Sequence, residues 1–291
     1  MNRQLRIWGY VFAFPAFALI TFMFVIPIIQ NIHLSFHRSD GISPMVFIGF
    51  ENYLSMFADR NFVTSVTNSL LWVGFTVVFA VGFGLLIAVF VNGIVGENVI
   101  KSIFFMPLTI SFVSIGAIWW NMYSRDFGVL NQILQLLGFE GRVDWLFDIP
   151  LNNISLLIAW SWQQLGGNLV LFLMGLTSIP SEQIEASRLD GCNRWKTFIY
   201  VIFPMLKPIT TVVVGMAIVN SFKAFDLIFI MTRGGPIRSS ETLAVTMFVE
   251  SFQRNNQGMG AAIGVFLTLL ILPITAIYMY ATSKVDHAEN K

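Results

Sequence analysis

The 291-residue chain is 56% hydrophobic and only 11% charged, whereas a soluble domain is typically about 25% charged. So few charges cannot cover a soluble fold that buries 29 Phe, 13 Met and 8 Trp, so the composition excludes an ordinary soluble protein. The formal net charge of +1 excludes a general attraction to nucleic acid or acidic lipid, and the single Cys192 excludes an internal disulfide. We therefore expect an all-α, polytopic membrane protein.

A bilayer core of about 30 Å needs about 20 apolar residues in a helix, because unpaired backbone groups cannot be left in hydrocarbon. The first such run follows the basic residues 1–6 and has no small-residue cleavage site, so we expect a retained anchor rather than a signal peptide. Six segments qualify, which predicts one transmembrane domain over residues 1–291. The predicted spans are 8–33, 66–91, 99–123, 154–176, 209–232 and 260–282.

An even number of spans places both termini on the same side of the membrane. With the termini inside, the inner segments carry nine basic residues and the outer segments carry seven. The inner segments are also shorter and contain five of the six lysines, so the positive-inside rule favours cytoplasmic termini. The inner residues are Arg3, Arg6, Lys101, Arg188, Arg194, Lys196, Lys207, Lys284 and Lys291, and the outer ones are Arg38, Arg60, Arg125, Arg142, Arg233, Arg238 and Arg254.

The inner connection over residues 177–208 is too long for a turn and too short for a catalytic domain, so we expect a docking element. Its first part has the pattern of a short capped helix. Ser181 is the expected N-cap, and Glu185 can pair with Arg188 one turn later. Gly191 supplies the left-handed residue that ends the helix.

A second short helix is predicted from about residue 193 to residue 203, ending at Pro204 because proline cannot continue a helix. Its apolar stripe consists of Trp195, Phe198, Ile199 and Ile202.

This connection resembles the E-A-A-x-x-D-G-A loop of binding-protein-dependent ATP-binding-cassette (ABC) import permeases, whose pattern continues to an Ile and a Leu-Pro. The residues in register are Glu185, Ala186, Asp190, Gly191, Phe198, Ile202, Pro204 and Pro208. Ser187 and Cys192 replace alanines of the pattern and Phe203 replaces its leucine, and all three changes are mild. An ordinary amphipathic connection that ends in Gly is the alternative explanation of this segment taken alone.

Motifs in the three outer loops resemble the sugar branch of the same family, in the same order along the chain. They are Phe47-Ile48-Gly49-Phe50-Glu51-Asn52-Tyr53 with Phe57, Gly128-Val129-Leu130-Asn131 with Trp145-Leu146, and Thr232-Arg233-Gly234-Gly235-Pro236 after Phe225-Asp226. The chain is similar to the maltose-type and glycerol-phosphate-type permease subunits over nearly its whole length. The resemblance implies the six-helix fold of type I ABC importer permeases.

The resemblance also implies a complex in a bacterial-type inner membrane. Its other members are a second and usually different permease chain, two cytoplasmic ATPase subunits that use ATP and Mg²⁺, and an external solute-binding protein. The residues implied to couple this chain to the ATPase are Glu185, Ala186, Asp190, Gly191 and Pro204. The sequence contains no G-x-x-x-x-G-K-[ST] motif and no Gly-Lys pair, so we expect no nucleotide or other cofactor on this chain itself.

Polar side chains in the fourth and fifth spans are candidate solute contacts, because such groups are costly in hydrocarbon. Lys223 and Asp226 lie three residues apart on one predicted helical face, and a mutual ion pair is the alternative role. The other candidates are Gln163, Gln164, Asn168 and Asn220 with Ser221, and Trp119, Trp120, Trp160 or Trp162 for stacking on a sugar. Interhelical hydrogen bonds explain the amides equally well, and interfacial anchoring is the alternative role of the tryptophans.

His33 and His37 have the spacing of metal ligands, but no third ligand accompanies them, so we expect an interfacial pair without metal. The sequence has no catalytic triad, glycosidase-like carboxylate pair or redox motif, so we expect a transport subunit rather than an enzyme. Two other functions stay open at this level. One is an ion-gradient-driven secondary transporter, which uses intramembrane acids, and the other is a non-transporting membrane scaffold.

Overall fold

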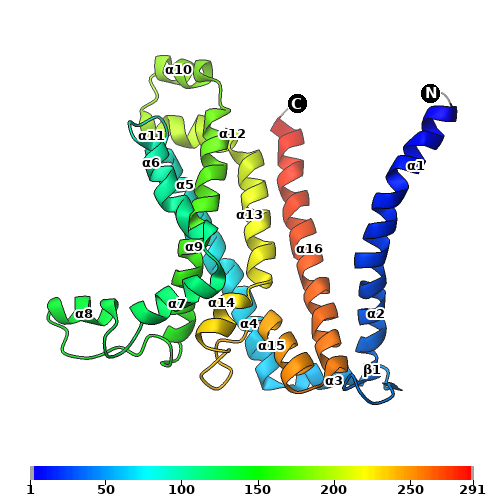
Figure 1. The fold of residues 1–291 in the computed structure, drawn as a ribbon. Coiled ribbons are helices and arrows are strands. Elements are labelled where there is room, and N and C mark those ends of the chain that lie inside the picture. Colours follow the sequence, from blue (N-terminus) through cyan, green and yellow to red (C-terminus); the bar gives the residue numbers. More distant parts are fainter. Residues whose placement is uncertain (1–2, 290–291) are drawn as a thin grey trace. The chain divides into compact units, whose positions relative to one another are not determined.

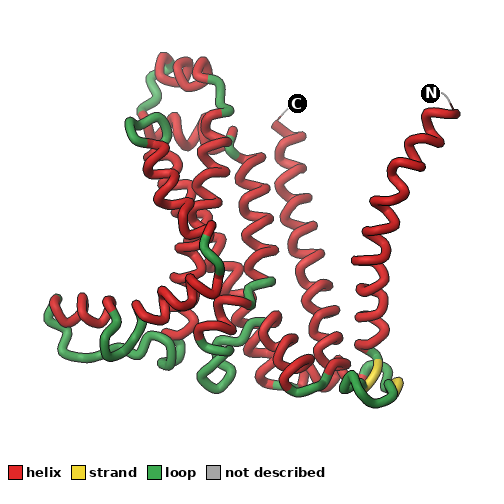
Figure 2. Tube along the Cα trace, viewed as in Figure 1, coloured by secondary structure: helices red, strands yellow, loops and turns green. Residues whose placement is uncertain are grey.

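The computed structural model describes residues 3–289, with side chains from residue 12 to residue 280, and the chain forms two compact units. Unit 1 combines the chain up to Phe62 with Thr246–Leu269, and unit 2 combines Val63–Val245 with the chain from Leu270 onward. Helices dominate both units, and one short hairpin supplies all the strands of the described residues (Figures 1 and 2). The prediction of an all-α membrane protein is confirmed.

Unit 1 contains the N-terminal helix, a small hairpin and the first part of the C-terminal helix. Its backbones touch where α16 begins, since a Cβ on Gly258 would lie 2.0 Å from the carbonyl oxygen of His37. Phe57, Phe62 and Phe266 pack edge to face with ring centroids 5.3 to 5.6 Å apart. The elements are α1 (Arg3–Ile20), a π-helical turn (Thr21–Val25), α2 (Ile26–Ser35), β1 (His37–Arg38), β2 (Val46–Phe47), α3 (Glu51–Ala58), a second π-helical turn (Val249–Gln253) and α16 (Gln257–Glu289), which continues into unit 2.

Unit 2 is built around α9 (Leu151–Thr177), which contacts α5, α6, α7, α13 and α14. The elements before α9 are α4 (Arg60–Phe75), a π-helical turn (Thr76–Val81), α5 (Gly82–Val91), α6 (Glu97–Phe105), a 3-10 turn (Met106–Thr109), α7 (Phe112–Met122) and α8 (Val129–Leu136). Those after it are α10 (Ser181–Leu189), α11 (Arg194–Thr197), a π-helical turn (Phe198–Ile202), α12 (Phe203–Met205), α13 (Lys207–Phe222), α14 (Asp226–Met231) and α15 (Leu243–Phe248).

Small residues let α9 approach its neighbours closely. A Cβ on Gly166 would lie 2.0 Å from the carbonyl oxygen of Phe104, so the backbones of α9 and α6 are in contact. On α5, a Cβ on Gly84 would lie 2.8 Å from the Cβ of Asn168. Close packing of this kind supplies van der Waals contacts between membrane helices, for which lipid gives no hydrophobic driving force.

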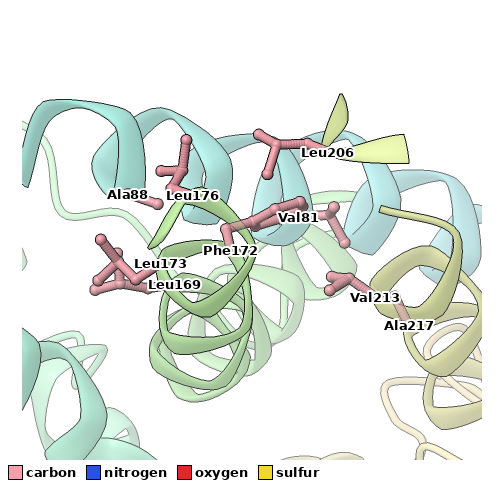
Figure 3. Packing of buried hydrophobic residues seen from close by; sticks show 9 residues of the cluster. All are labelled: Val81, Ala88, Leu169, Phe172, Leu173, Leu176, Leu206, Val213 and Ala217. Carbon is pink, nitrogen blue, oxygen red and sulfur yellow. The ribbon is translucent and has the colours of Figure 1, made fainter. Parts of the chain in front are cut away.

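A buried apolar cluster joins α9 to α5 and α13, as Figure 3 shows. Phe172 of α9 lies at its centre and is fully buried, and Leu206 reaches it from the turn before α13. The cluster consists of Val81, Ala88, Leu169, Phe172, Leu173, Leu176, Leu206, Val213 and Ala217. The C-terminal half of the predicted fourth span is therefore packed against the predicted second and fifth spans.

The structure agrees with six spans but changes the form of the third. Among the described residues, five helices are long and apolar enough to cross a membrane: Phe12–Ser35, Arg60–Val91, Leu151–Thr177, Lys207–Met231 and Gln257–Tyr280. The predicted third span, 99–123, is instead a pair of helices, Glu97–Thr109 and Phe112–Met122, bent by 101°. Pro107 lacks an N–H to donate, and Ser111 caps a new helix by accepting the N–H of Ser114.

The contact at Gly166 predicts a measurable difference between two neighbouring glycines. Gly166→Ala should lower the melting temperature of the purified protein, because overpacking against the Phe104 carbonyl costs about 1–3 kcal/mol, more than the helix propensity gained. Gly167→Ala should leave the melting temperature unchanged or raise it, since its Cβ would meet only the tip of Leu108 at 3.4 Å. Equal melting temperatures for the two variants, measured in detergent, would show that α9 can shift away without loss.

Candidate functional site

The short helix α10 projects from the end of α9 and exposes most of its side chains (Figure 1). It ends in a Schellman motif, in which Cys192 N–H donates to Ser187 O at 3.0 Å and Gly191 N–H donates to Arg188 O at 3.1 Å. Gly191 has φ +81°, as predicted. Glu185, Ala186, Asp190 and Gly191 are all exposed, so the structure presents four of the five predicted coupling residues on this one helix and its end.

Two details of α10 differ from the sequence prediction. Pro180, not Ser181, occupies the N-cap, because its extended backbone already fixes the first turn and leaves Ser181 as the first helical residue. No ion pair joins Glu185 to Arg188 within the described side chains.

Ser187, one of the departures from the family pattern, has a structural role. It is the one buried residue of α10, and its hydroxyl lies 3.1 Å from the hydroxyl of Thr197. It also donates to Ile184 O at 2.8 Å. A contact between two hydroxyl groups therefore joins the exposed helix to α11.

The predicted helix end at Pro204 is wrong. The chain stays helical from α11 through α12, where Pro204 lies in the first turn, and Leu206 N–H donates to Ile202 O at 2.9 Å. The π-helical turn just before it changes the hydrogen-bonding register, and the helix continues past the proline. The predicted apolar stripe is not buried as a whole, because Trp195 is 68% exposed.

Lys223 and Asp226 do not share one helical face, which corrects the prediction. α13 ends at Phe222, and Lys223 caps it; Phe225 has a non-helical backbone with φ −131° and ψ −60°, and Asp226 begins α14. Both charged side chains are exposed, and no ion pair joins them within residues 12–280. The fifth span is therefore interrupted at the two charges, which removes the helical register that would have paired them.

The polar residues of α9 lie on a stretch of two turns. Gln163 is buried, and its side-chain oxygen accepts a hydrogen bond of 2.6 Å from Gln164. Asn168 is half-buried where α9 meets Gly84, and its side-chain nitrogen has no partner among the described residues. Asn220 on α13 is also half-buried, and no hydrogen bond links it to these amides in that part of the chain. The structure thus places the α9 amides on one short stretch of helix, and no hydrogen bond among the described residues joins them to Asn220.

Two of the four candidate tryptophans are buried inside unit 2. Trp160 stacks on Phe112 with ring centroids 5.4 Å apart, and Trp119 packs edge to face on Trp162 at 5.8 Å. Trp160 is 4% exposed and Trp119 is 9% exposed, so neither can present a free ring face to a solute in this conformation. Trp120 is exposed and Trp162 half-buried, and these two keep an accessible surface.

Two neighbouring asparagines at the other end of α9 hold the turn that contains the T-R-G-G-P motif. Asn152 donates to Gly235 O at 3.1 Å and to Ser239 Oγ at 2.8 Å. Asn153 donates to Ser239 O at 3.0 Å. Both asparagines are buried, and their amide donors satisfy loop oxygens that water cannot reach freely.

A third asparagine, Asn68 on α4, completes this arrangement. It donates to Ser239 O at 2.7 Å and to Glu241 O at 2.8 Å, and its side-chain oxygen accepts a bond of 3.3 Å from Asn153. We call Asn68, Asn152 and Asn153 the asparagine clamp, and residues 232–241 the GGP turn. The clamp ties two helices to one turn.

The backbone of the GGP turn is unusual at residues that are not glycine. Arg233 and Ile237 each have φ +50°, and Arg238 has φ +62°. A left-handed conformation of this kind costs of order 1–3 kcal/mol for an ordinary residue and is least favourable for a β-branched one such as Ile237. Glu241, buried beneath the turn, accepts two bonds from Arg238, at 2.7 and 2.8 Å. The asparagine clamp and this ion pair together stabilise the conformation.

Buried asparagines also hold the motifs of the other two loops that the sequence predicts to be outer. Asn131 donates to three carbonyl oxygens, those of Ser124, Arg125 and Val143, at 2.9 to 3.3 Å. In unit 1, Asn52 donates to Ser35 O at 2.9 Å and to His37 O at 3.0 Å. Both asparagines are buried, which gives a physical reason for their place in the motifs.

The hairpin of unit 1 carries further polar groups. The N–H groups of Ile42 and Ser43 donate to the carboxylate of Asp40 and lower its pKa to about 2. The rings of His33 and His37 are 4.2 Å apart, and His37 Nδ1 lies 2.8 Å from His33 O. Within the part of the chain that the structure describes, no group of three His, Cys, Asp or Glu side chains is arranged to hold a metal.

The sequence analysis missed the asparagine clamp. Asn152 and Asn153 stand just before the predicted fourth span and Asn68 just inside the second, where amides are ordinary span ends. The useful signal was the adjacent Asn-Asn pair together with a Gly-Gly-Pro turn, whose backbone carbonyls need donors. Only the folded chain shows that these segments meet.

Comparisons with known proteins agree with this architecture. Residues 80–287 match the family described as binding-protein-dependent transport system inner membrane component. The chain is 35% identical over 266 residues to the osmoprotective compounds uptake permease protein GgtC of Synechocystis sp., covering 89% of this chain and 93% of that protein. It is 34% identical over 284 residues to the alpha-glucoside transport system permease protein AglF of Rhizobium meliloti, covering 94% of this chain and 83% of that protein. A chain of a solved bacterial ABC transporter involved in the import of the acidic polysaccharide alginate has the same fold, with a TM-score of 0.85, 20% identity and 96% of both chains covered.

Proposed function

The chain belongs to the family of binding-protein-dependent transport system inner membrane components, and we propose that it is the permease subunit through which an ATP-driven importer moves a sugar or similarly polar solute inward. Residues 1–291 act as one permease domain, and residues 177–208 form its ATPase-docking loop. The relatives named for osmoprotective compounds and for alpha-glucosides support a small polyhydroxylated solute.

The observation that carries this proposal is the exposure of α10. The helix and its end carry Glu185, Ala186 and Asp190 at exposed positions, and Gly191 ends the helix in a left-handed conformation. Such a helix fits a groove on a partner subunit, and the hydroxyl pair at Ser187 leaves the rest of its surface free for that contact. Pro204 acts indirectly, within the helix that connects α10 to the fifth span.

The energy comes from partner subunits. The chain has no phosphate-binding loop, so ATP and Mg²⁺ are used by two cytoplasmic ATPase subunits, and closure of these subunits moves the spans as rigid bodies. A second permease chain completes the pathway, and an external binding protein delivers the solute. We assign no catalytic step to this chain.

Solute contact is proposed at the polar residues of the fourth and fifth spans. Gln163, Gln164 and Asn168 offer amide donors and acceptors for sugar hydroxyls, and the interruption of the fifth span exposes Lys223 and Asp226 beside Asn220. Non-helical backbone at membrane depth is tolerated only where it lines a cavity or is buried in protein, which favours a position along the solute pathway.

Reconstituted uptake tests the function and the docking helix together. The complex in liposomes should accumulate solute only with ATP, and Glu185→Ala or Gly191→Pro should abolish uptake while membrane insertion stays normal. Glu185 is lost from the docking surface in one variant, and proline cannot adopt the φ of +81° in the other.

Glu140→Ala is the matched control, because Glu140 is an equally exposed acid on an outer loop. Uptake without nucleotide would indicate an ion-driven carrier, and no uptake at all would indicate a scaffold. Wild-type uptake rates for Glu185→Ala and Gly191→Pro would exclude α10 as the coupling element.

Cysteine labelling tests the proposed orientation, with both termini in the cytoplasm. Arg142→Cys should react with an impermeant thiol reagent added outside whole cells, and native Cys192 should not. The substitution removes only an exposed ion pair with Asp126, so little stability is lost. Inside-out vesicles serve as the control for the half-buried Cys192, which should then react. Labelling of Cys192 alone in whole cells would invert the topology.

Substitution of the amides tests the solute site. Gln164→Ala, Asn168→Ala and Asn220→Ala should each raise the solute concentration for half-maximal uptake several-fold, because a lost hydrogen bond is worth about 1 kcal/mol. Uptake and the amount of assembled complex are measured together, with Gln135→Ala on the exposed face of α8 as the control. If the amides only join helices, the variants will yield less assembled complex, and the apparent affinity for solute will be unaltered. That result would exclude these amides as solute contacts.

A further inference from the structure

A groove lies on unit 2 where the end of the predicted second span meets α11. Its walls are α5, the turn that follows α5, and the segment that begins with α11, and its volume is about 720 Å³. Sites for small molecules typically have volumes of about 300–1,000 Å³. α10, α11 and the C-terminal end of α5 lie at the same end of unit 2 (Figure 1). This end is cytoplasmic if α10 meets the ATPase, so the leaflet assigned below rests on the proposed function.

The lining of the groove is apolar along the span and polar where the helices end. Leu86 and Phe90 lie one turn apart on α5 and are 49% and 71% exposed. Ile94 continues the apolar lining in the turn after α5. The polar lining comes from Asn92, the first residue after α5, and from Arg194, the first residue of α11. A ligand with one apolar chain and one polar end matches this distribution.

The charge of Arg194 has no acceptor in this chain. Its side chain is exposed and forms no ion pair or hydrogen bond with the residues that the structure describes. Glu97, the acid that follows the turn of the groove, is already engaged, because it pairs with Lys101 and accepts the N–H of Gly93 at 2.8 Å. A guanidinium group beside an apolar groove favours an anionic ligand, and its planar set of donors matches a phosphate.

The short helix α11 holds its first two residues beside the groove. Asn193 caps this helix by accepting the N–H of Lys196 at 2.9 Å, and Trp195 stacks on Phe198 with ring centroids 6.1 Å apart. Trp195 lines the groove and is nevertheless 68% exposed. Indole rings are enriched where a membrane meets water, because one edge of the ring can donate a hydrogen bond while its body stays apolar.

We propose that this groove binds one anionic phospholipid of the cytoplasmic leaflet, with the lipid phosphate on Arg194 and an acyl chain along Leu86 and Phe90. The glycerol region of the lipid lies against the indole of Trp195. Basic pockets between membrane helices on the cytoplasmic side recognise anionic headgroups in this way. A phospholipid carries an anion next to an apolar chain at the required depth, whereas a protein partner would have to bring a carboxylate and an apolar ridge to the same membrane edge.

The bound lipid joins a membrane span to the base of the docking helix. The hydroxyl of Thr197, which is buried on α11, lies 3.1 Å from the hydroxyl of Ser187 on α10. A lipid that contacts both α5 and α11 therefore stabilises the segment to which α10 is attached.

Photolabelling of the complete permease complex tests the site. The complex is placed in phosphatidylcholine nanodiscs with a small fraction of phosphatidylglycerol that carries a photoactivatable group on one acyl chain. Label should concentrate on peptides that contain residues 82–94 and 194–198. Arg194→Gln should lower this labelling about tenfold, because a hydrogen bond between charged groups is lost. Photoactivatable phosphatidylcholine in the same amount should label these peptides several-fold less, since it carries no net charge.

Two pairs of variants separate the groove from its surroundings, and the yield of assembled complex is measured for each variant. Lys196→Gln removes an exposed charge from α11 that does not line the groove, so labelling should stay unchanged. Leu86→Trp fills the groove and should lower labelling about as far as Arg194→Gln does. Met216→Trp is its control on α13, where Met216 is 52% exposed, and it should have no effect.

Three results would overturn the proposal. Equal losses in Arg194→Gln and Lys196→Gln would show a general attraction of the basic surface for acidic lipid. Equal labelling by the two lipids would show an ordinary boundary lipid without selection for charge. Label on other spans but not on the groove peptides would show that a protein chain covers the groove. Failure of the proposed function is distinct, because ATP-dependent uptake would then be absent while the groove is still labelled.

Discussion

The backbone contact between α9 and the third span is the constraint on which the rest of unit 2 depends. Gly166 allows the backbones of α9 and α6 to touch at Phe104. Gly84 brings α5 against α9 at Asn168. Once these neighbours are fixed, the apolar cluster around Phe172 closes toward one membrane surface and the asparagine clamp forms toward the other. α9 therefore connects α10 at one end to the GGP turn at the other.

Buried asparagine side chains satisfy backbone oxygens of loops that cross the ends of the helices. Loops that cross the end of a helix bundle leave carbonyl oxygens partly shielded from water, and each unpaired group would cost stability. Asn52, Asn131 and Asn152 each supply two or more donated bonds to such oxygens or to a hydroxyl beside them. An amide fits this task because it offers two donors without a charge that would need its own partner.

The sequence was most informative where local chemistry decides the structure. Length and hydropathy predicted the spans, and the glycine pattern predicted the left-handed end of α10 at Gly191, which the structure confirms. It was least informative where the whole fold overrides local preference. Pro204 was expected to end a helix that continues past it, and Lys223 and Asp226 were assigned to one face of a helix that is interrupted between them. The clamp depends on segments about 85 residues apart in the chain, which no local pattern contains.

The bend of the third span has a consequence for how the protein is made. Its two helices hold 13 and 11 residues, about 20 and 17 Å, so neither alone crosses a hydrocarbon core of about 30 Å. The non-helical residues between them cannot face lipid, and in the folded chain α9 lies against this segment. The ribosome, however, synthesises α9 only after the bent segment has emerged. The cover of the bent segment is therefore supplied by a helix that follows it in the chain, so the segment and α9 form one unit of packing.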